Sequence, residues 1–223
     1  MRLLAVETGT DQCSVALCDG DNVVSRCDQR ARVHAKRILA MSDECLQEAG
    51  CALSNMDAIA FGRGPGSFTG LRIAVSVAHG LALGVDLPVI PISSLAGHAA
   101  AAWRTHDVDK VAVAVDARMT ECYWGCFRIR DGIPHLSGLE TIGSPADLPA
   151  LDGSGWFGTG TGWESYSELA SRYAQGLAGI DGGLLPEARD LIESARLSYD
   201  QGKVMAPEEA LPVYLRERVT DRS

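Results

Sequence analysis

The sequence predicts an α/β protein made of two related halves, in which mixed sheets are flanked by helices. Short apolar runs bounded by turn residues alternate with segments whose apolar residues recur at helical spacing. Strands and helices follow in the order β-β-β-α-β-α-β-α, and a second three-strand opening then begins near residue 111. We therefore expect an N-terminal unit over residues 1–105 and a C-terminal unit over residues 106–223.

The first half opens with three strands and a helix. Residues 3–7 are a buried strand, and residues 14–18 and 23–25 follow after polar turns, which predicts an antiparallel meander. From about residue 31 the apolar residues take helical spacing, and the pattern ends at Gly50, a residue that suits the end of a helix.

Two strand–helix pairs complete this half. Residues 56–61 are a short buried strand, and a glycine-rich turn leads into an alanine-rich helix over residues 70–83. Residues 88–91 return as a strand, and Ser93 or Ser94 caps a helix that runs to residue 103. This is the order of an RNase H-like half, in which right-handed crossovers place helices on both faces of the sheet.

The second half repeats the three-strand opening and then becomes rich in glycine. The predicted strands are residues 111–116, 122–129, 136–142 and 156–158, and the predicted helices are residues 164–173 and 187–199. The tail from residue 207 to residue 218 is predicted to be extended.

Composition and charge limit the classes of function. The net charge of −9 and the pI near 5.0 argue against a broad nucleic-acid face, since such binding needs clustered Lys and Arg. Residues 26–32 with Lys36 and Arg37 form either a local basic patch or an ordinary solvated start of a helix. Seven cysteines without a C-x-x-C pair fit reduced thiols in the cytoplasm. We expect no membrane span, because charged residues, glycine and proline interrupt the longest apolar stretch.

The glycine-rich turn is the first candidate site. It comprises Gly64, Pro65, Gly66, Ser67, Phe68, Thr69, Gly70, Leu71 and Arg72. Glycines and the N-terminus of a helix are features of an anion site. The spacing, however, matches neither the P-loop nor the dinucleotide fingerprint. The alternative is a tight strand-to-helix joint that small residues permit, with Ser67 or Thr69 as the N-cap.

The second candidate site is the turn after the first strand. Glu7, Thr8 and Thr10 could hold Mg²⁺ and a nucleotide phosphate there, and Asp116 takes the matching place in the second half. The alternative is an ordinary polar hairpin.

Neither a metal centre nor a catalytic group is indicated. The five histidines show no H-x-x-x-H or H-E-x-x-H spacing, and no serine lies in a G-x-S-x-G pattern. We therefore predict no catalytic residue and no metal ligand. A peptidase activity is not indicated, because the sequence shows no nucleophile–base pair.

The run Gly64 to Arg72 resembles the signature of the TsaB (YeaZ) family, which belongs to the actin-like ATPase (ASKHA) superfamily. Further matches, at residues 93–95, 116–118, 121–123 and 212–216, extend the resemblance over nearly the whole chain. The resemblance implies two ASKHA halves and a cytoplasmic protein. It also implies pairing with a catalytic TsaD subunit and a TsaE ATPase, which together attach threonylcarbamoyl to adenosine 37 of tRNA.

The resemblance further implies which helices meet the partner. These would present His34, Ile38 and Met41 from the first helix, and Leu71, Ala74, Val75, Ala78 and His79 from the second. The same residues could instead pack helices within one domain. An exposed apolar helix pair would also favour a homodimer when the partner is absent.

One departure concerns Glu7, which stands where the family usually has aspartate. The resemblance, with this departure, implies that no cofactor is required. ATP or ADP with Mg²⁺ could bind at the junction of the subunits, and tRNA would be contacted only through the complex. Our prediction is a non-catalytic supporting subunit. The alternative is an autonomous small ASKHA ATPase or phosphotransferase that uses Glu7, Thr8, Thr10 and Asp116.

Overall fold

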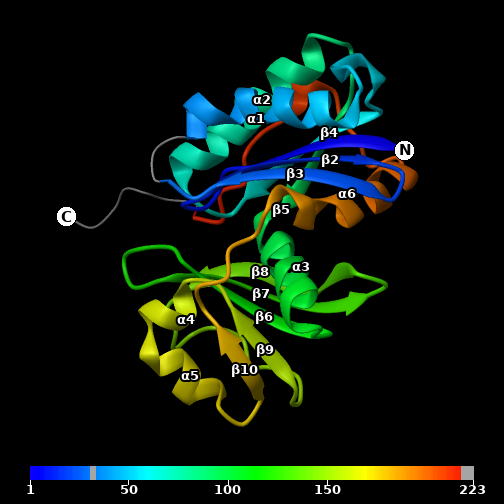
Figure 1. Ribbon diagram of the computed structural model, residues 1–223. Coiled ribbons are helices and arrows are strands. Elements are labelled where there is room, and N and C mark those ends of the chain that lie inside the picture. The colour runs from blue at the N-terminus through cyan, green and yellow to red at the C-terminus, as the bar shows by residue number, and fades with distance from the viewer. Residues whose placement is uncertain (31–33, 217–223) are drawn as a thin grey trace, which may run out of the picture.

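The computed structural model describes residues 1–30 and 34–216, which form two five-stranded mixed sheets (Figure 1). In the first sheet, β1 (Arg2–Glu7), β2 (Cys13–Asp19) and β3 (Asn22–Asp28) make the predicted antiparallel meander. β4 (Ala58–Gly64) and β5 (Val89–Ser93) join β1 in parallel, which gives the order β3-β2-β1-β4-β5. The predicted α/β fold with mixed sheets is confirmed.

Helices cover both faces of this sheet. α1 (His34–Ala49) and α2 (Phe68–Leu83) bury their apolar stripes against one face, and α1 ends at Gly50, whose φ is +65°. The predicted first turn of α1, residues 31–33, lies outside the described residues. Two short 3₁₀ turns, η1 (Leu53–Asn55) and η3 (Pro207–Glu209), flank this layer.

The second sheet has the order β10-β9-β6-β7-β8. Its strands are β6 (Lys110–Asp116), β7 (Cys122–Arg130), β8 (Ile133–Gly143), β9 (Trp156–Thr159) and β10 (Leu177–Asp181). α3 (Ser94–His106) covers the face toward the first half, and α4 (Gly162–Ser165) and α5 (Ser167–Tyr173) cover the other. Figure 1 shows α3 lying between the two sheets.

The structure differs from the sequence prediction in the second half. β10 was not expected, and the helix predicted over residues 164–173 breaks at Tyr166, whose backbone is extended. The helix predicted over residues 187–199 begins as the 3₁₀ turn η2 (Ala188–Leu191) and continues as α6 (Ile192–Asp200).

The end of the chain returns to the first half. Ala188, Leu191, Ile192 and Ala195 are buried against β1, β4 and β5, so η2 and α6 form the second helical layer of the first sheet. The predicted division placed these residues with residues 106–223. They pack on the first sheet because they form an apolar stripe that fits its uncovered face.

All seven cysteines are free thiols. Within the part of the chain that the structure describes, no helix combines the length and apolar character needed to cross a membrane.

Candidate functional site

Both sequence candidates in the first half lie at one place, the edge where β1, β4 and β5 end. Glu7 ends β1, Gly64 ends β4, and Ser93 ends β5 just before α3. The carboxyl ends of parallel strands are where open α/β sheets bind ligands, so this edge is the natural place for a nucleotide.

The Glu7 side chain itself fills this edge. Glu7 is fully buried, and its Oε1 accepts a hydrogen bond of 2.5 Å from the Gly9 N–H. Its Oε2 accepts one of 3.1 Å from the Ser94 hydroxyl. Burial raises the pKa of Glu7, and the hydrogen bonds from Gly9 and Ser94 oppose that rise. A Cβ on Gly62 would lie 1.9 Å from Oε2, so only glycine fits beside the carboxyl group.

The glycine-rich run packs directly on the turn that follows Glu7. The Ser67 N–H donates to the Gly9 carbonyl oxygen at 2.8 Å, and the Thr8 hydroxyl donates to the Gly70 carbonyl oxygen at 2.7 Å. A Cβ on Gly66 would lie 2.5 Å from the Gly9 oxygen, and one on Gly70 would lie 1.9 Å from the Thr8 oxygen. These glycines therefore allow two backbone segments to touch.

The helix that follows this run is capped by the chain. Ser67 is the N-cap of α2, as one of the two predicted alternatives had it, and its hydroxyl accepts from the Gly70 N–H at 3.3 Å. The Ser67 N–H and the Gly9 N–H also have partners within the chain, so these three backbone donors, with that of Gly70, already have acceptors. The geometry thus matches the tight joint better than the anion site.

Thr10 and Asp116 lie apart from this packed edge. Thr10 is half-buried, and His34 Nε2 donates to its carbonyl oxygen at 3.0 Å, which anchors the start of α1 on the turn. Asp116 Oδ1 accepts from the Arg118 N–H at 2.8 Å and from the Tyr166 hydroxyl at 2.9 Å. Burial, together with the Asp116 carboxylate, raises the pKa of Tyr166 to about 12. Across residues 1–30 and 34–216, no hydrogen bond or ion pair joins Asp116 to the Glu7 turn.

No metal centre was found in the same residues: no group of three or more His, Cys, Asp or Glu side chains is placed to hold an ion. Sequence reasoning missed Gly62 and the role of Ser94. Their partner Glu7 is distant in sequence, and periodicity gives no signal for such a contact.

The predicted partner-interface residues lie mostly inside the molecule. Most of them are buried within the chain, namely Ile38, Met41, Leu71, Ala74, Val75 and Ala78, and only His34 and His79 are half-exposed. The spacing of three and four residues places the six buried residues on the helix faces that meet the sheet, so they pack within this chain, and His34 and His79 are the two that reach its surface.

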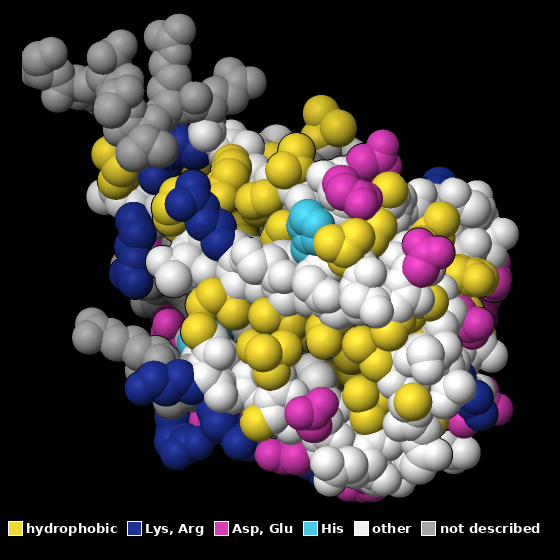
Figure 2. All heavy atoms as spheres, turned by 90° about the horizontal axis from the view of Figure 1, so that it is seen from above, with side chains coloured by type: hydrophobic (Ala, Val, Ile, Leu, Met, Phe, Trp, Pro, Cys, Tyr) yellow, Lys and Arg dark blue, Asp and Glu magenta, His cyan; other side chains and the backbone are white. Residues whose placement is uncertain are grey.

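The opposite faces of the two helices carry a shallow groove. It is lined by Ala35 from α1 and by Phe68, Thr69, Arg72, Ile73, Ser76 and Val77 from α2. Phe68 is 55% exposed, and Leu39 of α1 is 51% exposed. Figure 2 looks down on this side of the molecule and shows apolar side chains gathered across its middle. α2 is thus apolar on both its inward and its outward face, which is typical of a helix covered on both sides.

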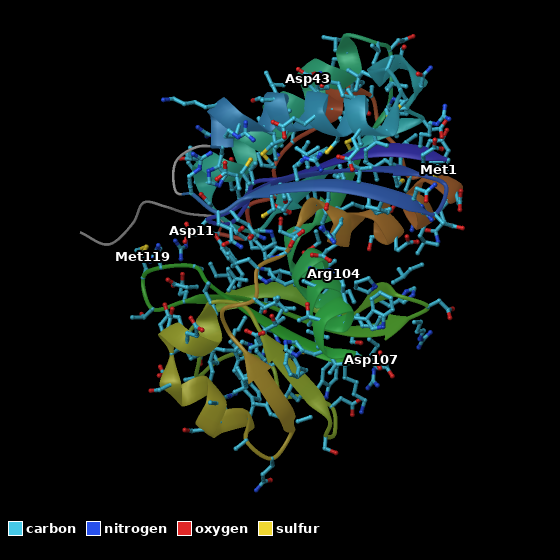
Figure 3. All side chains as sticks on the ribbon, viewed as in Figure 1. Met1, Asp11, Asp43, Arg104, Asp107 and Met119 are labelled. Carbon is cyan, nitrogen blue, oxygen red and sulfur yellow. The ribbon has the colours of Figure 1, made fainter. Side chains whose placement is uncertain are left out.

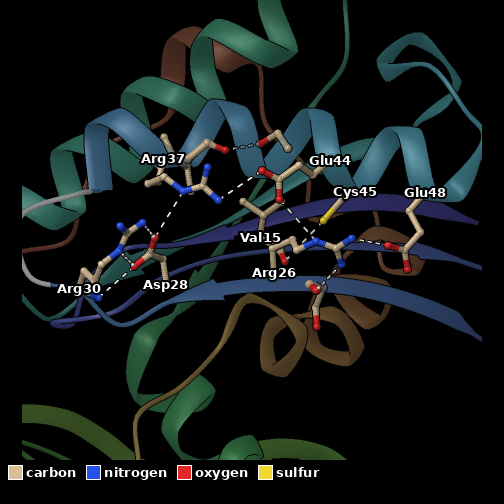
Figure 4. A network of polar contacts seen from close by, with 11 residues as sticks. Val15, Arg26, Asp28, Arg30, Arg37, Glu44, Cys45 and Glu48 are labelled. Carbon is tan, nitrogen blue, oxygen red and sulfur yellow. Dashed lines mark hydrogen bonds and ion pairs between the residues drawn. The ribbon is translucent and has the colours of Figure 1, made fainter.

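The segment flagged as a local basic patch is largely neutralised. Arg26 pairs with Glu44 and Glu48, and Arg37 bridges Asp28 and Glu44 (Figure 4). Arg30 also pairs with Asp28. These ion pairs tie β3 to α1, so the segment serves to join a sheet edge to its covering helix.

Comparisons with known proteins show which family the chain resembles. The family model described as "TsaD: tRNA N6-adenosine threonylcarbamoyltransferase" matches residues 28–151. The chain is 41% identical to the tRNA threonylcarbamoyladenosine biosynthesis protein TsaB of Escherichia coli, over 98% of this chain and 96% of that protein. It is 40% identical to the protein of the same name from Haemophilus influenzae, over 99% of this chain and 95% of that protein.

A solved structure is similar over the same extent. "YeaZ from Pseudomonas aeruginosa" superimposes with a TM-score of 0.90 at 45% sequence identity, and the match covers 96% of this chain and 99% of that chain.

Proposed function

The chain belongs to the TsaB family of tRNA threonylcarbamoyladenosine biosynthesis proteins, and we propose that it serves this pathway as a non-catalytic supporting subunit. In this proposal it acts in the cytoplasm, pairs with a TsaD-type threonylcarbamoyltransferase and stabilises it, with a TsaE-type ATPase as a further member of the complex. The modified nucleoside is adenosine 37 of tRNA, which this subunit reaches only through the complex.

The observation that carries the non-catalytic role is the filled strand edge. Glu7 occupies the space between Gly9, Gly62 and Ser94, and the Ser67 N–H bonds to the Gly9 carbonyl oxygen. ATP or ADP with Mg²⁺ would have to displace a fully buried side chain to bind at this edge. We therefore place any nucleotide of the complex at the junction with the partner subunit.

The pairing itself is supported by the groove between α1 and α2. Its apolar and arginine lining is typical of the centre of a protein–protein interface. Without its partner, the same surface is the one on which we expect two copies of this chain to associate.

The test is reconstitution with the TsaD-type and TsaE-type proteins of the same organism. Affinity for the transferase is measured by calorimetry, and the modified nucleoside is measured by mass spectrometry of digested tRNA. Ser76→Arg places a charge in the groove at an exposed helix position, so we expect a loss of affinity of about tenfold or more without a loss of fold.

The matched control is Ser171→Arg, at an exposed position of α5 in the other half. Equal modification of tRNA with and without this chain would refute the supporting role, and an unchanged affinity of Ser76→Arg would refute the groove as the contact. Val75→Arg is unsuitable, because Val75 is 8% exposed and a buried charge would unfold the domain.

The rival reading, an autonomous ATPase, has its own measurement. Calorimetry of the isolated chain with Mg-ATP should show no binding in the micromolar range. Binding with turnover that disappears in Glu7→Gln would favour the ATPase over the supporting subunit.

A further inference from the structure

The C-terminal strap, which we define as residues 211–216, crosses from one half of the molecule to the other. It leaves Ala210, which is buried in the core beneath α2, and then passes the glycine-rich run. The Val213 N–H donates to the Arg63 carbonyl oxygen at 2.8 Å, and a Cβ on Gly64 would lie 3.0 Å from the Val213 oxygen. The middle of the strap is therefore fixed against the end of β4.

On the first half, the strap extends the groove. The Tyr214 ring lies 5.6 Å from the Phe68 ring, and Arg72 Nε donates to the Tyr214 hydroxyl at 3.4 Å. The Arg72 guanidinium in turn lies 3.8 Å above the Phe68 ring. Since Phe68 and Arg72 also line the groove between α1 and α2, the groove and the strap form one continuous surface.

On the second half, the strap holds the loop between β6 and β7. Arg216 donates to the Ala117 carbonyl oxygen at 3.1 Å, pairs with Glu121, and reaches Met119 Sδ at 3.6 Å. Met119 is 72% exposed, and Figure 3 shows it at the same end of the molecule as Asp11. Tyr214 and Arg216 are two residues apart, and two extended residues span at most about 7 Å. Phe68, which packs on Tyr214, therefore lies near Met119, which Arg216 contacts.

The side chains exposed from the groove across the strap to Met119 are of the types that protein–protein interfaces favour. Phe68, Tyr214 and Met119 are large and apolar, and the Arg118 side chain beside them is 87% exposed. Aromatic residues, Met and Arg are the types enriched at the centres of protein–protein interfaces. The bonds of Val213 and Arg216 hold the strap in place before any partner arrives, which lowers the entropic cost of binding.

We propose that the partner-binding surface continues from the groove across the strap onto Met119, and that it takes an acidic segment of the partner protein flanked by apolar side chains. The carboxylate of that segment pairs with Arg72, and its apolar side chains contact Phe68, Tyr214 and Met119. One partner then holds both halves of this chain together. This inference rests on the proposed pairing with the transferase subunit.

A protein fits this surface better than RNA does. The chain carries a net charge of −9, and two arginines along the path already have carboxylate partners, Arg118 on Asp116 and Arg216 on Glu121. Arg72 stacks on Phe68 and is the arginine left for a partner's carboxylate. An RNA backbone requires several cations that are free to replace its counterions. A single carboxylate flanked by apolar side chains requires only one such cation.

The test measures the affinity of the full chain for the transferase subunit. We expect about tenfold weaker binding for Tyr214→Ala and about threefold weaker binding for Met119→Ser. Ile180→Ser is the matched control, since it removes an apolar side chain that is 42% exposed on β10, and its affinity should stay within about twofold. Hydrogen exchange should also show that residues 116–121 become protected in the wild-type complex.

Each outcome decides between the proposals. If Ser76→Arg abolishes binding while Tyr214→Ala and Met119→Ser bind like wild type, and residues 116–121 gain no protection, the pairing stands and the strap surface is refuted. If the wild type does not bind the transferase at all, the proposed function fails and this inference fails with it. If Tyr214→Ala displaces the strap, Met119→Ser still tests the surface, because Met119 is exposed and lies outside the strap.

Fluorescence anisotropy with labelled, unmodified tRNA tests the other class of partner. Salt-sensitive binding of the isolated chain that is lost in Tyr214→Ala and Arg118→Glu, with unchanged affinity for the transferase, would assign the surface to RNA and overturn the proposal.

Discussion

Gly62→Ala should place a methyl group where the Glu7 carboxyl group now lies. The new Cβ would fall 1.9 Å from Oε2 and 2.6 Å from Cδ of a side chain that is fully buried. Overpacking of this kind costs about 1–3 kcal/mol. Displacing the carboxyl group also removes the acceptor of the Gly9 N–H and the Ser94 hydroxyl, which costs about 1–3 kcal/mol more. We expect the free energy of unfolding to fall by about 3–5 kcal/mol.

A double-mutant cycle with Glu7→Ala separates this clash from a general effect on β4. Glu7→Ala alone leaves the same two donors without an acceptor, so we expect it to cost about 2–3 kcal/mol. In the double variant the donors are lost only once and the methyl group enters the vacated space. The combined loss should therefore be smaller than the sum of the single losses by about 2 kcal/mol.

Urea denaturation followed by circular dichroism measures all four proteins. Gly80→Ala is the control, because the site lies within α2 and its added Cβ would meet no atom within 4 Å. We expect it to stabilise the protein by about 0.5–1 kcal/mol. Losses for Gly62→Ala and Glu7→Ala that add to within about 0.5 kcal/mol would refute the view that Glu7 fills the cradle beside Gly62.

Three further predictions concern buried charges. Burial raises the pKa of Glu7, so its contribution to stability is present below the unfolded value of 4.5 and is lost as pH rises through the folded value. Glu7→Gln should therefore gain stability relative to wild type as pH rises above 4.5, and parallel urea profiles of the two proteins would contradict this. Burial lowers the pKa of His98 to about 4. The free energy of unfolding of the wild type should therefore fall by up to about 3 kcal/mol as pH falls from 6.5 to 4. Urea titration at each pH should show a smaller fall for His98→Gln. Arg104→Ala should cost about 3 kcal/mol in thermal or urea unfolding, since it leaves the buried Asp190 carboxylate without its cation, and adding Asp190→Asn should recover part of the loss.

The first half could be predicted from the sequence because its signals are local. Apolar runs and helical spacing identified β1 through α3 in order, Gly50 marked the end of α1, and Ser67 was one of the two predicted caps of α2, which begins two residues before the predicted helix. β10 escaped prediction because it is short and contains Gly179, so neither alternation nor a long apolar run marked it.

The packing of distant segments could not be predicted in the same way. The spacing of Ala188, Leu191, Ile192 and Ala195 indicates an amphipathic segment but does not say which sheet it covers. The contact between Thr8 and Gly70 joins residues 62 apart, so the sequence could present two candidate sites without revealing that they fill each other. The apolar stripe of α2 was likewise ambiguous between core and interface, and only burial distinguished its two faces.

α2 links the filled strand edge to the proposed partner surface. Its first turn rests on the Glu7 turn through Gly70, and Leu71, Ala74 and Ala78 press the rest of the helix onto the sheet. The same first turn presents Phe68 to the groove and to the strap. A change in the packing of the Glu7 turn therefore moves the end of the helix that the partner would contact. Under the supporting role proposed above, the glycine-rich run sets the position of a binding helix, which accounts for the close packing of Gly66 and Gly70 on the Glu7 turn.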